Sequence, residues 1–188
     1  MNRRDFLSCA TLVAVSRPAR ADDGPAWDAL LAGGCAVLMR HAQTEPGIGD
    51  PPGFKLDDCR TQRNLSAAGR AQAQRFGERL RSRGVRIDEL RSSRWCRCLD
   101  TARLAFPTLP VQPFDPLNSF FEDRRTGPQQ TAALRRYLAG LGSRNALLVT
   151  HQVNISALTG EFAAMGEAVV VGAAADAASR VLGRLRID

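Results

Sequence analysis

Short apolar runs alternate along this chain with longer stretches in which apolar and polar positions recur at helical spacing. Residues 35–39 (CAVLM) and 146–149 (ALLV) are uninterrupted apolar runs, typical of strands buried on both faces. Residues 66–82 carry apolar side chains on one helical face and arginines on the other. Ser66 is a suitable N-cap for this helix, and Gly84 a suitable stop. The first two elements predicted along the chain are therefore a strand and then a helix.

The same alternation continues to the end of the chain. Further strands are expected at residues 89–92 and 111–114, further helices at 96–106 and 126–141, and two closing strands at 168–171 and 180–187. The closing pair is expected to form an antiparallel hairpin or a sheet edge. Alternating strands and helices predict an α/β fold, a three-layer sandwich with a mostly parallel central sheet flanked by helices.

The N-terminus has a different pattern. Arg3 and Arg4 stand directly before an apolar stretch that continues to Val15, and residues 19–21 (ARA) provide a small-x-small cleavage site. This arrangement resembles a twin-arginine export signal over residues 1–21, with a frayed amphipathic helix as the alternative. We expect residues 22–188 to form the mature domain in the periplasm. The apolar stretch is shorter than the roughly 20 residues that span a bilayer, so no stable membrane insertion is expected after cleavage.

Composition and charge narrow the class of protein. The chain has 188 residues, 44% of them hydrophobic and 24% charged, which suits one folded domain. Removing residues 1–21 takes away four arginines and one aspartate, so the formal charge of +7 falls by three to +4. This modest charge, without an aromatic and basic platform, gives no support for nucleic-acid binding. Arginine supplies nearly all the positive charge, which suits phosphate recognition but follows equally from a compositional bias of the genome.

The only two histidines occupy equivalent positions. His41 and His151 each follow a buried apolar run directly, and strand carboxyl ends are where ligands bind in open α/β sheets. Arg40 adjoins the first histidine, and Arg97 begins the helix after the 89–92 strand. Such a cationic cluster favours a bound anion, and phosphate has enough oxygens for both guanidinium groups. An ion pair with Asp100 is the alternative role for Arg97.

The segment from residue 42 to about residue 64 contains three prolines and three glycines, and no periodic pattern of apolar residues. Structureless segments of this length in a compact domain are usually functional. We therefore expect this loop to border the ligand site.

Four segments resemble motifs of the histidine phosphatase superfamily, the phosphoglycerate mutase-like proteins. They are residues 38–44 (LMRHAQT), 64–73 (NLSAAGRAQA), 93–102 (SRWCRCLDTA) and 149–151 (VTH). The resemblance extends from about residue 35 to residue 160. The sequence departs from the family's pattern at Ala42, where glycine is usual, at Cys98, where alanine is usual, and at residues 152–153, where many members carry glycines.

The resemblance implies a small exported phosphatase of branch 1 that hydrolyses phosphomonoesters without a metal or another cofactor. His41 would attack phosphorus and form a phosphohistidine, with Arg40, Arg97 and His151 binding the phosphoryl group. The implied partner is a phosphorylated small molecule or phosphorylated glycan. Small size and export resemble members that act on envelope sugar phosphates. A catalytically silent phospholigand-binding protein, a phosphohistidine phosphatase and a mutase remain alternatives.

Family members commonly protonate the leaving oxygen with a carboxylic acid that precedes the second histidine. Glu122 is the favoured candidate and Asp123 the second, because two preceding phenylalanines would partly desolvate a carboxyl group. Both residues could instead be surface charges paired with Arg124 and Arg125.

The cysteines raise two further possibilities. A zinc site built from both histidines with Cys96 and Cys98 is disfavoured, because the neighbouring arginines would repel a cation. Cys59 lies in the long loop, and we hypothesise a disulfide between it and Cys96, since the family packs a small residue inward at the position of Cys98. Four buried thiols are the alternative for the mature chain.

Overall fold

The computed structural model describes residues 24–172 and 180–187, so the predicted export signal at residues 1–21 lies outside the described residues. One six-stranded sheet, in the order β3-β2-β4-β1-β5-β6, forms the centre of the fold. The strands are β1 (Cys35–Arg40), β2 (Glu89–Ser92), β3 (Val111–Pro113), β4 (Ala146–Thr150), β5 (Ala168–Gly172) and β6 (Val181–Leu185). The first four are parallel, whereas β5 runs antiparallel to β1, and β6 antiparallel to β5. The predicted mostly parallel sheet is confirmed.

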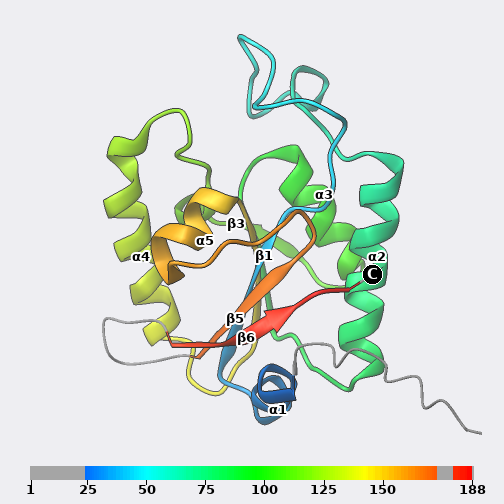
Figure 1. Cartoon of the computed structure of the whole chain (residues 1–188), viewed down its shortest axis with the longest axis vertical. Coiled ribbons are helices and arrows are strands. Elements are labelled where there is room, and N and C mark those ends of the chain that lie inside the picture. The colour runs from blue at the N-terminus through cyan, green and yellow to red at the C-terminus, as the bar shows by residue number, and fades with distance from the viewer. Residues whose placement is uncertain (1–23, 173–179, 188) are drawn as a thin grey trace, which may run out of the picture.

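Helices cover both faces of this sheet (Figure 1). One face packs against α1 (Gly24–Ala32), α2 (Ala67–Ser82) and α3 (Cys96–Ala105), and the other against α4 (Gly127–Ala139) and α5 (Gln152–Thr159). In β1, Val37 and Met39 join the first core, while Ala36 and Leu38 join the second. Because both faces of β1 are covered, its sequence is apolar throughout rather than alternating. The three-layer architecture predicted from the sequence is therefore present.

Helix boundaries follow the local signals where such signals exist. The Ser66 hydroxyl accepts a hydrogen bond from the Gly69 amide at 3.1 Å and so caps α2. Helices α1 and α5 were not predicted, because they have nine and eight residues, too few for a clear apolar period. None of the helices in the described ranges is both long enough and apolar enough to span a membrane.

The closing strands form the expected antiparallel hairpin, and only one of them is at the edge of the sheet. Strand β5 lies between β1 and β6, and all but its last residue are buried, so β6 forms the edge. This arrangement puts β1 and β4 in the middle of the sheet, where both are covered on two faces.

The long loop after β1 projects above the carboxyl ends of the parallel strands (Figure 1). It contains one short 3₁₀ turn, Cys59–Thr61, and is joined to the first residue of α3 by a Cys59–Cys96 disulfide with Cα atoms 5.6 Å apart. The Gln62 side-chain oxygen accepts a hydrogen bond from the Cys96 amide at 2.9 Å, while its NH₂ group donates to two carbonyls of the loop. The loop is thus attached to the start of α3 by a covalent bond and by the Gln62 amide.

Breaking this disulfide should destabilise the protein without unfolding its core. Replacing Cys59 and Cys96 together by serine frees a loop of 37 residues, which the chain-entropy model equates with about 4 kcal/mol of unfolding free energy. Urea denaturation of the variant and the wild type measures the loss.

The matched control is Cys35→Ala, which removes a buried free thiol. In this variant, reducing the Cys59–Cys96 disulfide should lower the unfolding free energy as much as it does in the wild type. Peptide mapping of residues 22–188 without reductant should recover one bridge and two thiols. Four alkylatable thiols within that range would contradict the pairing.

Candidate active site

Strands β1 and β4 place the two histidines side by side. The strands are parallel neighbours, with Arg40 in register with Thr150, so the next residue of each emerges at the same sheet edge. The imidazole centroids of His41 and His151 are 5.5 Å apart, and both residues are almost fully buried. The sequence prediction placed both residues at strand ends, and the structure brings them together.

The backbone determines which nitrogen of His41 is free. Its Nδ1 lies 2.9 Å from the carbonyl oxygen of Ala42, which can only accept a hydrogen bond. Nδ1 therefore carries the proton, and Nε2 keeps its lone pair. Burial, followed by the positive charge of Arg97, lowers the pKa of His41 from 6.5 to about 3, so the ring is neutral near pH 7.

His151 has the opposite nitrogen engaged. The Ser93 hydroxyl lies 2.8 Å from Nε2 of His151, which leaves Nδ1 for a ligand. The Trp95 ring meets the imidazole edge-on at 5.3 Å between centroids. Burial, then electrostatic repulsion from His41 when that ring is protonated and from Arg97, lower the pKa of His151 well below its ordinary value. Both histidines are therefore neutral side chains in a cationic surrounding.

Two arginines of this site keep unsatisfied nitrogens. The Nε atoms of Arg40 and Arg97 are buried without a hydrogen-bond partner among the described residues. Arg40 is held by a 3.1 Å hydrogen bond from Nη1 to the carbonyl of Ala163. The expected alternative for Arg97, an ion pair with Asp100, is not formed, because Asp100 pairs with other arginines of α2 and α3. Buried unpaired donors are costly, so this pair favours an anion with several oxygens.

Arg63 is a third arginine of the site that sequence reasoning missed. Its Nε donates to the carbonyl of Gly49 at 2.8 Å, and its Nη1 donates to Thr44 and Gly47. It contributes to lowering the pKa of Arg40, after burial, which shows that their charges are close. No apolar period or spacing marks residue 63 in the sequence, because its partners are mainly backbone groups of the same irregular loop.

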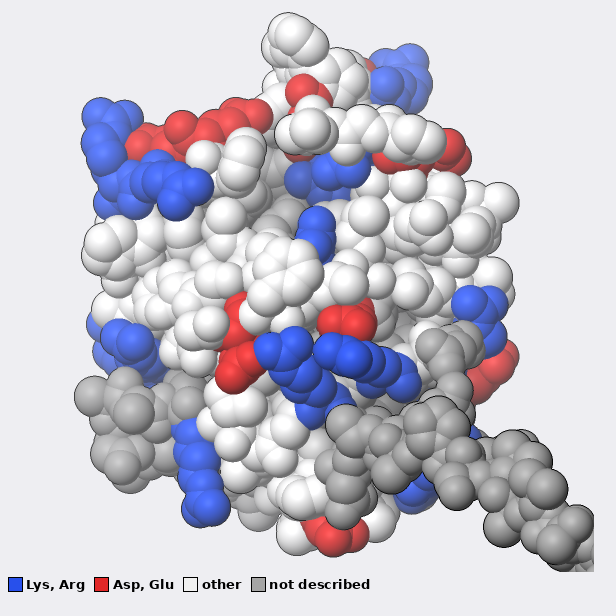
Figure 2. Space-filling model, viewed as in Figure 1, with Lys and Arg blue, Asp and Glu red and all other residues white. Residues whose placement is uncertain are grey.

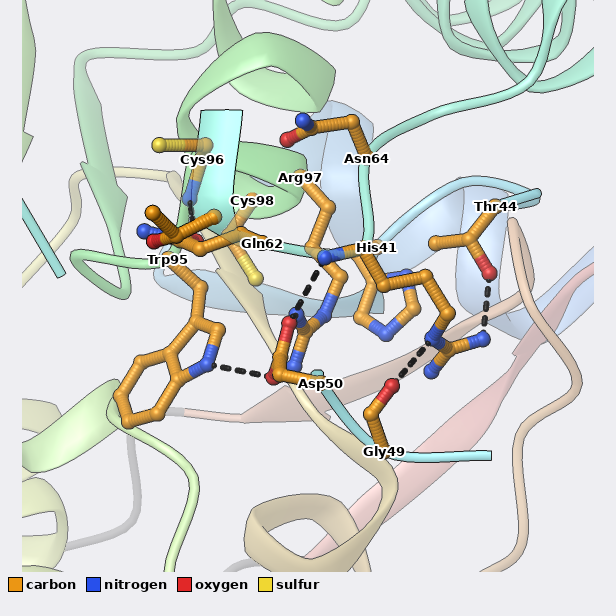
Figure 3. A network of polar contacts seen from close by, with 12 residues as sticks. His41, Thr44, Gly49, Asp50, Gln62, Asn64, Trp95, Cys96, Arg97 and Cys98 are labelled. Carbon is orange, nitrogen blue, oxygen red and sulfur yellow. Dashed lines mark hydrogen bonds and ion pairs between the residues drawn. The ribbon is translucent and has the colours of Figure 1, made fainter. Parts of the chain in front are cut away.

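Asp50 was missed for the same reason and lies inside the site (Figure 3). Its carboxylate accepts hydrogen bonds from Arg97 Nη1 at 2.7 and 3.0 Å, from Trp95 Nε1 at 3.0 Å and from the Arg63 amide at 3.0 Å. Burial opposes the ionisation of Asp50, but the hydrogen bonds and charge of Arg97, together with the hydrogen bonds from Arg63 and Trp95, lower its pKa overall. Asp50 is therefore a buried anion that partly neutralises the arginines.

The 64–73 segment fixes the backbone that follows His41. Helix α2 approaches this backbone so closely that a Cβ on Gly69 would lie 1.8 Å from the carbonyl oxygen of Gln43. The Gln72 side-chain oxygen accepts a hydrogen bond from the Gln43 amide at 3.0 Å. Gly69 and Gln72 therefore hold the backbone of Gln43, two residues after His41, in place.

The 93–102 segment acts in a similar way from the other side. The Thr101 hydroxyl accepts a hydrogen bond from the Ala42 amide at 3.0 Å and donates one to the carbonyl of Arg97 at 2.7 Å. One side chain thus joins the backbone beside His41 to the first turn of α3. The same helix carries Cys98, whose sulfur lies 3.5 Å from His151 Nε2.

The two carboxyl candidates lie at the mouth of the site and differ in their surroundings. Asp123 forms an ion pair with Arg125 at 2.8 Å, whose hydrogen bond lowers the Asp123 pKa. No described residue pairs with Glu122. Its side chain is exposed, so the expectation that the two preceding phenylalanines would partly desolvate it is wrong. The structure therefore leaves Glu122 as the carboxyl group at the mouth without an internal partner.

The two histidines, the three arginines of the site, Asp50 and the two carboxyl candidates line a cavity of about 660 Å³, called here the strand-end pocket. It is far larger than a phosphate group and extends from the two histidines to the mouth formed by the long loop. The zinc arrangement considered from the sequence is not formed, because Cys96 is in the disulfide. Among the described residues, no group of three or more histidine, cysteine or acidic side chains is arranged to hold a metal ion.

Comparison with known proteins agrees with this geometry. Residues 36–122 match the family model of the histidine phosphatase superfamily (branch 1). No curated protein sequence is detectably similar to the chain.

Solved structures share the fold at low sequence identity. The protein histidine phosphatase SixA, in complex with tungstate, is 15% identical with a TM-score of 0.61, over 80% of this chain and 96% of its own. A putative alpha-ribazole-5'-P phosphatase from Escherichia coli K-12 is 20% identical with a TM-score of 0.58, over 82% and 95%. A phosphoglycerate mutase from Thermus thermophilus is 22% identical with a TM-score of 0.55, over 82% and 99%.

The family match includes most of β1, which His41 follows directly, and all of α3, which carries Arg97. Residues 36–122 therefore match branch 1 of the histidine phosphatase superfamily, and the chain shares its fold with phosphatases and mutases of known structure.

Proposed function

We propose that this protein is a metal-independent phosphomonoester hydrolase that works through a phosphohistidine on His41. One observation carries the proposal. A neutral His41 with a free Nε2 lies in a buried pocket in which the Nε atoms of Arg40 and Arg97 have no hydrogen-bond partner within the part of the chain that the structure describes. A nucleophile beside unoccupied anion donors is the arrangement that phosphoryl transfer requires.

Binding uses groups that are already in place. Arg40, Arg97 and Nδ1 of His151 hold the non-bridging phosphoryl oxygens and stabilise the charge that they carry in the transition state. No reorganisation of the histidines is needed, because the Ala42 carbonyl and the Ser93 hydroxyl already orient both rings.

The reaction proceeds in two displacements. Nε2 of His41 forms a bond to phosphorus while the bond to the leaving oxygen breaks, and Glu122 donates the proton that this oxygen takes. The Ala42 carbonyl accepts a hydrogen bond from Nδ1 and so stabilises the cationic ring of the phosphohistidine. Water then attacks phosphorus, the Glu122 carboxylate accepts its proton, and inorganic phosphate and neutral His41 are released.

We also propose that the protein acts in the periplasm. The twin-arginine-like sequence of residues 1–21 supports export, and the Cys59–Cys96 disulfide suits an oxidising compartment.

The Arg97–Asp50 ion pair bears on phosphate affinity. Arg97 uses only Nη1 for Asp50, so its Nε stays available to a phosphoryl oxygen. A phosphate dianion at Arg97 must therefore bind next to a buried carboxylate. The negative charges of the phosphate and of Asp50 repel each other when both contact Arg97, so Asp50 should weaken the binding of phosphate and favour its release as product.

Replacing His41 by alanine should abolish turnover of a generic phosphomonoester, because the nucleophile is gone. Arg97→Ala and His151→Ala should each lower kcat/KM by about 100-fold or more, as expected for lost transition-state contacts. Wild type quenched in alkali during turnover should carry a phosphoryl label that is lost in acid and absent from His41→Ala.

Arg103→Ala is the matched control for Arg97, since Arg103 is an exposed arginine of the same helix and should have little effect. Label retained in His41→Ala would mean another nucleophile. A folded wild type that turns over no phosphomonoester would indicate a silent binding protein.

Both imidazoles should stay neutral between about pH 5 and pH 8, because burial and the arginines lower their pKa values. The chain has only two histidines, so ¹⁵N NMR resolves both, and His41 should show a protonated Nδ1 and an unprotonated Nε2.

The sign of the effect on stability follows from the same shifts. Below pH 6.5 the unfolded chain takes up protons that the folded imidazoles do not, so acid should destabilise the fold. Titration of His41 with a midpoint near 6.5 in the folded protein would refute the proposed electrostatics.

Asp50→Asn should tighten competitive inhibition by inorganic phosphate about tenfold, since it removes a negative charge beside Arg97 and keeps a side chain of the same shape. Inhibition constants for the variant and wild type provide the measurement. Asp58→Asn is the control, because Asp58 is an acidic residue of the same loop that pairs with exposed Arg60. Weaker inhibition in Asp50→Asn would show that Asp50 serves mainly to orient Arg97.

A further inference from the structure

Exposed apolar side chains gather at the mouth of the strand-end pocket. Five large hydrophobic side chains are exposed among the described residues: Leu31, Ile48, Leu56, Phe121 and Phe162. Three of them, Ile48, Phe121 and Phe162, line the pocket and are called here the apolar rim. They are 95%, 54% and 61% exposed and come from three separate segments of the chain. Exposed apolar groups that converge on one cavity indicate a binding surface.

Aromatic side chains continue this surface toward the histidines. Phe54, Trp95 and Phe120 line the pocket below the rim, and the rings of Phe54 and Trp95 are 5.9 Å apart. Trp95 is fixed by the hydrogen bond from its Nε1 to Asp50. A rigid aromatic ring close to the phosphoryl site can pack against the organic part of a substrate.

Most polar side chains of the pocket mouth have partners within the protein. Asp123 pairs with Arg125, and the Thr126 hydroxyl donates to the carbonyl of Asp123. The Gln152 NH₂ group donates to Ser156 and to a carbonyl, and its oxygen accepts from the Ala163 amide. These groups offer little to a substrate with many hydroxyls, which would lose hydrogen bonds to water on entry.

Figure 2 shows the same division on the surface. Blue atoms are visible in the hollow below the long loop, white surface borders much of it, and a group of red and blue atoms lies along its upper left side. A ligand that fits this surface carries its negative charge at one end and apolar atoms at the other.

We propose that the strand-end pocket takes phosphomonoesters of bulky apolar alcohols, aromatic ones in particular. This inference rests on the proposed function and names its substrate class. The phosphoryl group binds at Arg40 and Arg97, and the leaving group packs against Trp95 and the apolar rim. The hydroxyl-rich sugar phosphate suggested by analogy from the sequence is the competing class.

Binding without turnover tests the rim directly. Alkyl phosphonates keep the anionic head and are not hydrolysed, so calorimetry on the wild type can compare 3-phenylpropylphosphonate with ethylphosphonate. Burial of the phenyl group should make the first bind at least about tenfold more tightly. Equal affinities would overturn the proposal.

Variants of the rim locate the contact. Phe121→Ala and Phe162→Ala remove exposed side chains, so the fold should survive, and each should lower the affinity ratio of the two phosphonates several-fold. Leu31→Ala is the matched control, because Leu31 is 57% exposed on α1 and does not line the pocket; its ratio should equal that of the wild type. A ratio unchanged in the double variant of Phe121 and Phe162 would also overturn the proposal.

Turnover separates this inference from the proposed function. Ethyl phosphate, 3-phenylpropyl phosphate and glucose 6-phosphate are all esters of primary alcohols, and kcat/KM should be highest for the phenylpropyl ester. A preference for glucose 6-phosphate would sink the apolar substrate class while leaving the phosphatase intact. Selective binding of the phenylpropyl phosphonate with no turnover of any ester would contradict the proposed phosphatase activity and leave the apolar binding site intact.

Discussion

The parallel pairing of β1 with β4 is the interaction on which the site depends. Register between these central strands places the residue after each of them at the same edge, and both residues are histidines. The pairing is stable because both strands are apolar on two faces and are covered by helices on each side. A slip of one residue would exchange the faces of a whole strand, so packing in both cores protects the geometry of the histidines.

Burying several cations around two imidazoles creates an electrostatic problem that the protein solves in two ways. The histidines stay neutral, because burial and neighbouring arginines disfavour their protonation. Asp50 brings a carboxylate from the long loop to Arg97, and the disulfide and Gln62 attach that loop to α3. The anion site can therefore exist without its ligand while still keeping arginine nitrogens free for one.

Sequence patterns predicted the parts of this arrangement that regular structure determines. His41 and His151 are recognisable because a strand end is visible in the sequence as an apolar run followed by a polar residue. Asp50 and Arg63 are not recognisable, since they act through irregular backbone whose path depends on tertiary contacts. The prediction that Phe120 and Phe121 would shield Glu122 from solvent was wrong for a related reason, because two consecutive phenylalanines need not cover the residue that follows them. Apolar side chains in loops, such as Ile48, carry no periodic signal at all.

The hydroxyl of Thr101 is shared between the peptide beside His41 and the carbonyl of Arg97. Accepting one hydrogen bond and donating another from the same atom, inside a closed core, is chemistry that only an alcohol side chain of this length provides. Valine would preserve the volume and lose both bonds, whereas serine would keep them and leave a small void. Nucleophile and anion donor are therefore coupled through one oxygen atom, so that a change at residue 101 reaches His41 and Arg97 at once.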